Sequence, residues 1–293
     1  LSTYSTLSDA LIEAAETSLV VVDEVHKSYR VSKRTSAIRS VVEACPRFVA
    51  MTATPTPDRG EVIGERWIAD SVAFPLTKHN FLVGAAQMVG AKVELSIEAQ
   101  EKILLVNLSP NDSAMHVEFL CNGGMWSAAA EHVRRATFVA MGTKAMELAE
   151  EDRAANPGGG VLMFMDNESE AEEMRKQLAL AVDGKNYSVG TRVGNELNKE
   201  VGIAITTKKD VAGYNFVRMG AIVTGVYAES AASRHQLRGR IRRIGQKRDV
   251  VQYWTVFARN TILSMLFDRH NTVDAKNASL EQLASEFVKQ TRK

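Results

Sequence analysis

The stretch Val161-Leu162-Met163-Phe164-Met165 decides the fold class, because it is apolar at every position and precedes an amphipathic stretch over residues 168–181. Consecutive apolar residues are typical of a strand buried on both faces, as in a parallel sheet. Similar runs lie at residues 19–22, 48–51, 201–205, 221–223 and 250–256. Strands that alternate with helices predict an α/β fold with parallel sheets flanked by helices.

The composition is that of a globular chain. The 293 residues are 45% hydrophobic and 24% charged, and this length suffices for two domains. No apolar stretch approaches the roughly 20 residues of a membrane-spanning helix, which argues against an integral membrane protein. The only two cysteines, Cys45 and Cys121, exclude a disulfide scaffold and indicate a reducing, intracellular compartment.

Charge is balanced overall but not locally. The formal net charge is +1, which argues against a uniformly basic surface that coats nucleic acid. Nine acids and one base lie between Glu147 and Glu173, and we interpret this acidic run as a solvated helix face. Seven basic residues and no acid lie between Arg234 and Arg248. These cations repel one another unless they face anions, and phosphate is the obvious anion.

Two acids follow the first predicted strand, in the sequence Asp23-Glu24-Val25-His26. Ligands bind at the carboxyl ends of the strands in parallel α/β sheets, so this pair is well placed for a metal-bound phosphate. One carboxylate can hold Mg²⁺ while its neighbour orients an attacking water. The alternative is an acid pair that merely ends a strand at the surface.

Polar loops follow two further predicted strands. Met51-Thr52-Ala53-Thr54-Pro55 places two hydroxyls where they could bond the acidic pair, although a capped turn is the simpler interpretation. The loop over residues 206–216 offers hydroxyls and backbone N–H groups to a phosphate, and Gly213 permits a close backbone approach. An ordinary strand-to-helix loop is the alternative for the second segment.

The most informative segment is Gln236-Leu237-Arg238-Gly239-Arg240-Ile241-Arg242-Arg243-Ile244-Gly245-Gln246. Gln236, Arg240 and Arg243 are four and then three residues apart, so a helix would place them on one face. A planar guanidinium is suited to offset the charge that develops on a transferring phosphoryl group.

The two isoleucines of this segment, Ile241 and Ile244, should then face elsewhere, toward the core. The alternative, a solvated basic helix, would not need Gly239 inside it. We therefore favour a functional interpretation.

In their order along the chain, these four segments resemble the motifs of the two-lobed RecA-like ATPases of helicase superfamily 2. Residues 23–26 match motif II, 52–54 motif III, 206–215 motif V and 236–243 motif VI. Arg243-Ile244-Gly245-Gln246 is similar to the R-I-G-Q of the Swi/Snf-type branch, and Val250, Tyr253, Thr261 and Ile262 continue that pattern. Residues 103–109 resemble the bridge between the lobes of that branch, and Gly142-Thr143-Lys144 its entry into the second lobe.

This resemblance implies two RecA-like lobes, of which the first is incomplete. Residues 1–75 would be the C-terminal part of lobe 1, 76–136 the bridge, 137–272 lobe 2 and 273–293 a C-terminal helix. It also implies an ATP hydrolase, a motor that moves along double-stranded DNA and binds ATP and Mg²⁺ between its lobes.

The family's functional residues carry over by motif. Catalytic roles fall on Asp23, which also binds the metal, and on Glu24, Arg240 and Arg243. Nucleotide binding and coupling fall on His26, Thr52, Thr54, Gly213, Asn215 and Gln236. Contacts to the DNA backbone fall on Thr207 and on Thr3 and Tyr4, which match the Thr-Tyr of motif Ib.

The sequence departs from the family pattern in several places. It contains no G-x-x-x-x-G-K-[ST] P-loop, so we expect that the first part of lobe 1 is missing and that residues 1–293 alone do not hydrolyse ATP. Glu229-Ser230-Ala231 replaces W-N-P, Leu263-Ser264 stands where E-E is usual, and Asp210-Val211 replaces paired glycines. These differences indicate a divergent member of the family, for which a viral or phage origin is one interpretation.

Two other interpretations stay open. A chain without a P-loop could bind DNA or a protein and hydrolyse nothing, and an upstream P-loop in the reading frame would decide against this. A strand-separating DExH helicase or an RNA-directed enzyme of the same superfamily is the second, and an unwinding assay would identify it. The sequence predicts neither the biological process nor the protein partners.

Overall fold

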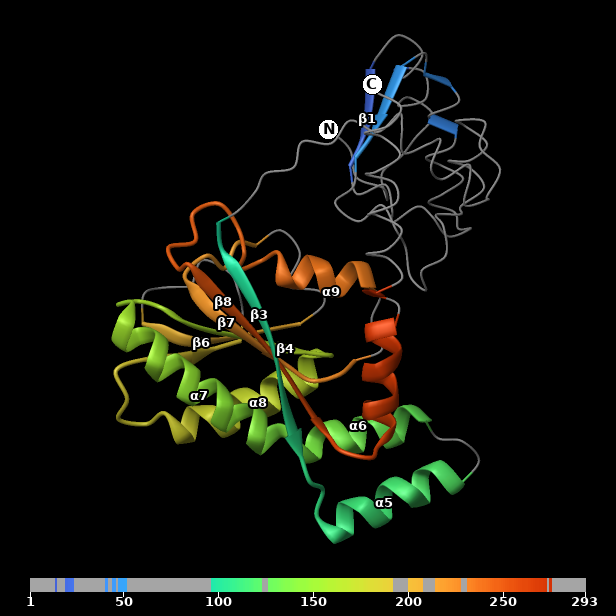
Figure 1. Ribbon diagram of the computed structural model, residues 1–293, viewed down its shortest axis with the longest axis vertical. Helices are drawn as coiled ribbons and strands as arrows, with labels where there is room; N and C mark the ends of the chain where they lie inside the picture. Colours follow the sequence, from blue (N-terminus) through green and yellow to red (C-terminus); the bar gives the residue numbers. More distant parts are fainter. Residues whose placement is uncertain are drawn as a thin grey trace. The chain divides into compact units, whose positions relative to one another are not determined.

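The computed structural model describes residues 14, 19–23, 40–41, 44–45, 47–51, 96–122, 126–191, 200–207, 214–227, 231–272 and 274–275. The chain divides into two compact units (Figure 1). The first comprises Leu1–Lys92, Ser230–Ala232 and Asn271–Lys293, and the second comprises Val93–Glu229 and Ser233–His270.

The described part of the first unit contains two parallel strands, β1 (Leu19–Val22) and β2 (Arg47–Ala50). Both confirm predicted strands. The Met51 backbone N–H donates to the Val22 carbonyl at 2.8 Å, so the pairing continues to the carboxyl end of both strands. Asp23 is an exposed turn residue directly after β1. The chain segments that follow the two strands therefore start at the same edge.

The second unit is built on a six-stranded parallel sheet in the order β3-β8-β7-β4-β6-β5. The strands are β3 (Glu98–Val106), β4 (Gly160–Met165), β5 (Ser188–Gly190), β6 (Val201–Thr207), β7 (Met219–Thr224) and β8 (Val250–Ala258). The predicted runs at 161–165, 201–205, 221–223 and 250–256 all lie in these strands. The α/β class with a parallel sheet flanked by helices, as expected of a RecA-like lobe, is confirmed.

Helices cover both faces of this sheet (Figure 1). Val161, Met163 and Met165 of β4 are buried in one core cluster with α7 (Phe138–Ala155) and α8 (Glu168–Ala181). Leu162 and Phe164 point the other way, into a cluster with Leu237 of α9 (Ala231–Arg238). Successive side chains of a strand alternate between faces, so a strand between two helical layers must be apolar throughout.

Two more helices precede α7, namely α5 (Pro110–Cys121) and α6 (Trp126–Ala136). Side chains that accept from helix N–H groups mark two helix starts. Ser109 accepts from the Asp112 N–H at 3.1 Å ahead of α5, and Asn167 accepts from the Glu170 N–H at 2.9 Å ahead of α8. The predicted helix over residues 168–181 is confirmed. None of the helices in the described residues is long and apolar enough to cross a membrane.

Part of the segment that the resemblance assigns to a bridge is described, and it forms a strand and two helices. Residues 98–106 form β3, an edge strand that pairs with β8 from Glu98 opposite Val250 to Val106 opposite Ala258. They belong to the second unit, together with α5 and α6. The hydrogen-bond partners of β3 lie about 150 positions along the chain, and local sequence cannot indicate such a pairing. The domain boundaries themselves stay a prediction.

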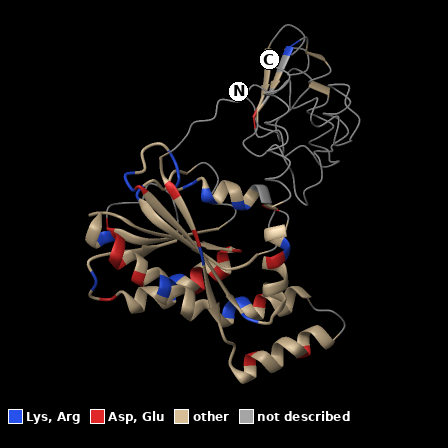
Figure 2. Ribbon diagram, viewed as in Figure 1, with Lys and Arg blue, Asp and Glu red and all other residues tan. Residues whose placement is uncertain are grey.

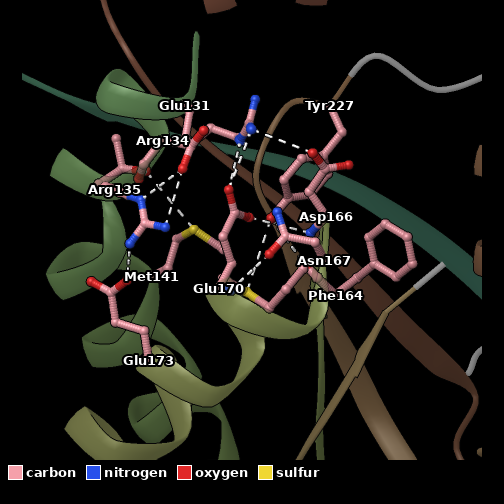
Figure 3. A network of polar contacts seen from close by, with 12 residues as sticks. Glu131, Arg134, Arg135, Met141, Phe164, Asp166, Asn167, Glu170, Glu173 and Tyr227 are labelled. Atoms are coloured by element: carbon pink, nitrogen blue, oxygen red, sulfur yellow. Dashed lines mark hydrogen bonds and ion pairs between the residues drawn. The ribbon is translucent and has the colours of Figure 1, made fainter. Parts of the chain in front are cut away.

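The acidic run is not only a solvated face, because Glu170 is 0% exposed. Its carboxylate accepts from Nε and Nη2 of Arg134, both at 3.3 Å (Figure 3). Arg134 Nη2 also donates to Asp166 at 3.3 Å, and the guanidinium lies 5.3 Å from the ring centroid of Tyr227. The network lies at the carboxyl ends of β4 and β7 and ties α6 to α8.

Burial raises the pKa of the Glu170 carboxyl above its usual range, and the charge of Arg134 opposes this shift. Such a carboxyl binds its proton more tightly in the folded state than in the unfolded state. The stability that it confers is therefore fully present below its unfolded pKa and is lost as the pH rises through its folded pKa.

The first testable prediction concerns Arg134→Met, which leaves the buried Glu170 carboxylate without this cation. The free energy of unfolding should fall by about 3 to 5 kcal/mol at pH 8. The loss should shrink at pH 5, because Glu170 is then protonated to a larger extent and needs no cation. Urea unfolding at both pH values measures this difference.

Arg135→Met is the matched control, since the neighbouring arginine pairs with Glu131 and Glu173 at the surface. Exposed pairs contribute at most about 1 kcal/mol, so this variant should lose little, and equally at both pH values. Equal losses for the two variants would contradict the assignment of Arg134 as the buried partner.

Candidate functional site

The helix that carries motif VI ends earlier than predicted. α9 ends at Arg238, and Arg240 and Arg243 lie in the turns that follow, not on a helix face with Gln236. The Arg240 backbone N–H donates to the Leu237 backbone carbonyl, three residues back, at 3.0 Å. Gly239 favours this termination, because glycine is among the poorest helix formers.

The residues after α9 pass into the core and out again. Ile241 is 0% exposed and packs in the cluster on the α9 face of the sheet, as predicted. Ile244 is 79% exposed, so its predicted core position is wrong. Gly245 follows with φ +96, a backbone conformation that glycine adopts without strain. The turn over residues 239–245 therefore points Arg242 to Gly245 outward from a buried anchor.

This turn contacts the end of predicted motif V. The Phe216 N–H donates to the Arg240 carbonyl at 3.0 Å, and Arg240 Nη1 donates to the Tyr214 carbonyl at 3.3 Å. Arg243 Nη1 donates to the Asn215 Oδ1. Asn215 and Arg243 are both exposed. Three residues that sequence analysis assigned to the site, Asn215, Arg240 and Arg243, are thus brought together.

The turn lies at the amino end of the sheet. The Met219 N–H, which starts β7, donates to the Phe216 carbonyl at 2.9 Å. Thr207 lies at the other end, because it is the last residue of β6 and pairs with Met165, the last residue of β4. Its side chain is 3% exposed, so contact with DNA would need its neighbours to move. That contact stays a prediction.

Figure 2 marks the Lys and Arg residues along the ribbon. Several cations of the basic run, for which the sequence suggested phosphate, have partners within the chain. Arg248 donates to both carboxylate oxygens of Asp152 at 2.5 Å. Arg238 donates to Glu101 at 3.1 Å, and Arg242 Nε donates to the Ile97 carbonyl at 2.9 Å. These partners lie 96, 137 and 145 positions away, so the spacing within the run gave no signal of them.

Sequence analysis also missed the role of Gln246, the last residue of R-I-G-Q. Its Nε2 donates to the carbonyls of Met219 and Ile241, at 3.0 and 2.9 Å. Its Oε1 accepts from the backbone N–H groups of Lys247 and Arg248, at 3.0 and 3.3 Å, and from Arg248 Nη1 at 2.9 Å. The motif itself was a signal for this residue, but its backbone partners were not visible in the sequence.

The remaining predicted site residues are divided between the units and the undescribed segments. Asp23 belongs to the first unit, and Gln236 is half-buried on α9. Those that lie outside the described residues are Thr3, Tyr4, Glu24, His26, Thr52, Thr54 and Gly213. Within the described part of the chain, no group of three or more His, Cys, Asp or Glu side chains could hold a metal ion.

No protein-family model and no curated protein matches the chain. Among solved structures, the C-terminal part of the Fun30 ATPase domain is similar, with a TM-score of 0.40 and 11% sequence identity. The similarity covers 68% of this chain and 99% of that one.

A second prediction tests the path of the turn. Ile241→Ala removes a fully buried side chain and should lower the free energy of unfolding by about 2 to 4 kcal/mol. Ile244→Ala is the matched control and should change it by no more than about 0.5 kcal/mol, because this side chain is exposed. Urea unfolding measures both. A helical segment with both isoleucines in the core would instead give two large losses.

Proposed function

We propose that this chain is part of an ATP-dependent motor of the Swi/Snf type that moves along double-stranded DNA. The observation that supports it is the docking of the Arg240–Arg243 turn on residues 214–216. The end of predicted motif V and the end of predicted motif VI, separated along the chain, meet here in one exposed cationic turn at the amino end of a parallel sheet. In the proposal, ATP is hydrolysed between this turn and the other RecA-like lobe.

Arg243 would act on the phosphoryl group during transfer. Its guanidinium is exposed and hydrogen-bonded to Asn215, so a small side-chain movement would free it for an anion. Arg240 is held more firmly, through its backbone carbonyl and through Nη1, and would set the position of the turn. Nucleotide binding and coupling would fall on Gln236 and Gly213 in this lobe.

Asp23 is the described residue that fits the predicted magnesium role. Its carboxylate is exposed at the carboxyl edge of two parallel strands. Magnesium in nucleotide sites is commonly held by one or two carboxylates, together with phosphate oxygens and water, so a large cluster of acids is not needed. Glu24 would orient the attacking water, and His26, Thr52 and Thr54 would couple that site to the other lobe.

The central test is Arg243→Ala in a polypeptide that includes the P-loop expected ahead of residue 1. An arginine that meets the phosphoryl group mainly in the transition state lowers the barrier more than it improves ATP binding. DNA-stimulated hydrolysis should therefore fall at least about 100-fold in kcat, with little change in the KM for ATP. Arg243→Lys should restore little, because an ammonium cannot reproduce the planar fork.

Lys247→Ala is the matched control, because Lys247 is exposed and its substitution removes one positive charge from the same segment, as Arg243→Ala does. Arg248 would be a poor control because of its ion pair with Asp152. If Lys247→Ala lowers kcat as much as Arg243→Ala does, the basic run is a phosphate-binding surface and not a catalytic element. Absence of hydrolysis by the parent polypeptide would favour a binding module instead.

The proposal also predicts how DNA is bound. Contacts from Thr3, Tyr4 and Thr207 would go to the backbone, which positions a protein on DNA without reading the sequence. Binding should weaken steeply as salt increases and should be nearly equal for unrelated duplexes. Fluorescence anisotropy over a salt series measures both properties. A flat salt response would contradict backbone tracking, and strand separation in an unwinding assay would favour the DExH alternative.

A further inference from the structure

We infer that Gln246 and the Arg248–Asp152 ion pair position the turn that carries Arg243. The inference has two parts. That these residues hold the turn in place does not depend on the proposed function, whereas the effect of this positioning on catalysis rests on it. The three residues form a continuous chain of hydrogen bonds from α7, through the entrance to β8, to the base of the turn. Asp152 is the α7 end of this chain and Gln246 is the end at the turn.

Gln246 closes the turn at its base. Its backbone N–H donates to the Arg243 carbonyl at 3.0 Å, while its side-chain amide donates to the Ile241 carbonyl. The same amide nitrogen donates to the Met219 carbonyl, which belongs to the first residue of β7. One side chain thereby joins the entry of the turn to the sheet. Because both amide hydrogens are used, a side chain without this donor pair cannot replace it.

The oxygen of Gln246 is fixed in turn by Arg248. Arg248 Nη1 donates to it, and the other guanidinium nitrogens, Nε and Nη2, hold the Asp152 carboxylate at 2.5 Å. The Arg248 and Asp152 side chains are only 10% and 12% exposed. Asn156 Nδ2 also donates to Asp152, at 3.2 Å. A bidentate pair that is nearly shielded from water holds its geometry more strictly than a surface pair.

A glycine in β7 leaves room for this ion pair. A Cβ at Gly220 would lie 2.7 Å from Asp152 Oδ1 and 2.8 Å from Arg248 Nε, closer than side-chain atoms can approach. The backbone of β7 therefore passes directly against the pair. This close packing transmits the position of α7 to the segment that follows the turn.

Between the two anchors, Arg242 makes a further contact, because its Nε donates to the Ile97 carbonyl at 2.9 Å. Ile241 is buried on one side of the turn and Gln246 is half-buried on the other, while residues 242–245 are exposed. The position of Arg243 thus depends on the anchors, on the neighbouring Arg242 contact and on its own contact with Asn215. A phosphoryl-transfer arginine must be placed to within about 1 Å, so loss of an anchor should affect the rate of the chemical step.

The test compares Gln246→Ala and Gln246→Glu with Lys247→Ala. Gln246→Glu keeps the size and the acceptor but puts a carboxylate against two carbonyls, so it remains informative if the alanine variant is unstable. Amide hydrogen exchange over residues 239–249 of the 293-residue chain should become about tenfold faster in both Gln246 variants, as expected when a hydrogen bond is lost. Exchange in β4 and β6 should not change, and Lys247→Ala should match the parent.

The second measurement is DNA-stimulated hydrolysis by the polypeptide that includes the P-loop. Both Gln246 variants should lower kcat about 10- to 100-fold at an unchanged KM for ATP, which a merely destabilising change would not do below the melting temperature. Arg248→Lys, which keeps the charge but loses the bidentate geometry, should lower kcat less than the Gln246 variants.

The two measurements separate the two ideas. Unchanged hydrogen exchange in the Gln246 variants would overturn the inference, whatever the enzymatic result. Faster exchange in the Gln246 variants with the kcat of the parent would show that Gln246 holds the turn without serving catalysis, and would overturn the positioning role. Exchange could be faster in the Gln246 variants while the parent polypeptide itself does not hydrolyse ATP. That result would reject the proposed function and the catalytic part of the inference, but the role of Gln246 in holding the turn would stand.

Discussion

Burial of the central strands on both faces is the constraint on which the rest of the second unit depends. Every side chain of β4 and β6 is buried, so each strand needs a helical layer above and below it. α7 and α8 supply one layer, and α9 with the turn after it supplies part of the other. Because the strands are parallel, the chain must cross from one end of the sheet to the other between them, and each crossing places a loop at a defined end.

The two ends of this sheet carry different polar chemistry. At the carboxyl end, Arg134 and Glu170 are buried as a pair that joins α6 to α8. At the amino end, Arg248 and Asp152 join α7 to the start of β8, and the exposed Arg243 lies on the adjoining turn. Ion pairs shielded from water cost solvation energy and fix geometry, whereas an exposed guanidinium stays available to a ligand. The second unit thus combines rigid pairs with one accessible arginine turn.

The same segment therefore serves structure and proposed function at once. Of the cations between Arg234 and Arg248, those nearest the sheet contact carbonyls and carboxylates of the chain, which relieves their mutual repulsion. Arg243 differs because it donates to the exposed side-chain amide of Asn215, a neutral group that competes weakly with an anion. Ile244, beside Arg243, is exposed because the turn leaves the core after Ile241.

The sequence by itself determined the α/β class, the main strands and the helix over 168–181, because apolar runs and amphipathic patterns act within a few residues. It also singled out Asn215, Arg240 and Arg243, which the structure brings together. Only the tertiary structure decided that α9 ends at Arg238, that β3 joins the second sheet, and that Arg248 pairs with Asp152. The last two features depend on which strands become neighbours and on partners about 100 or more positions away, whose proximity is set by packing and not by any local pattern. The end of α9 goes with the turn that follows it, which contacts residues 214–216.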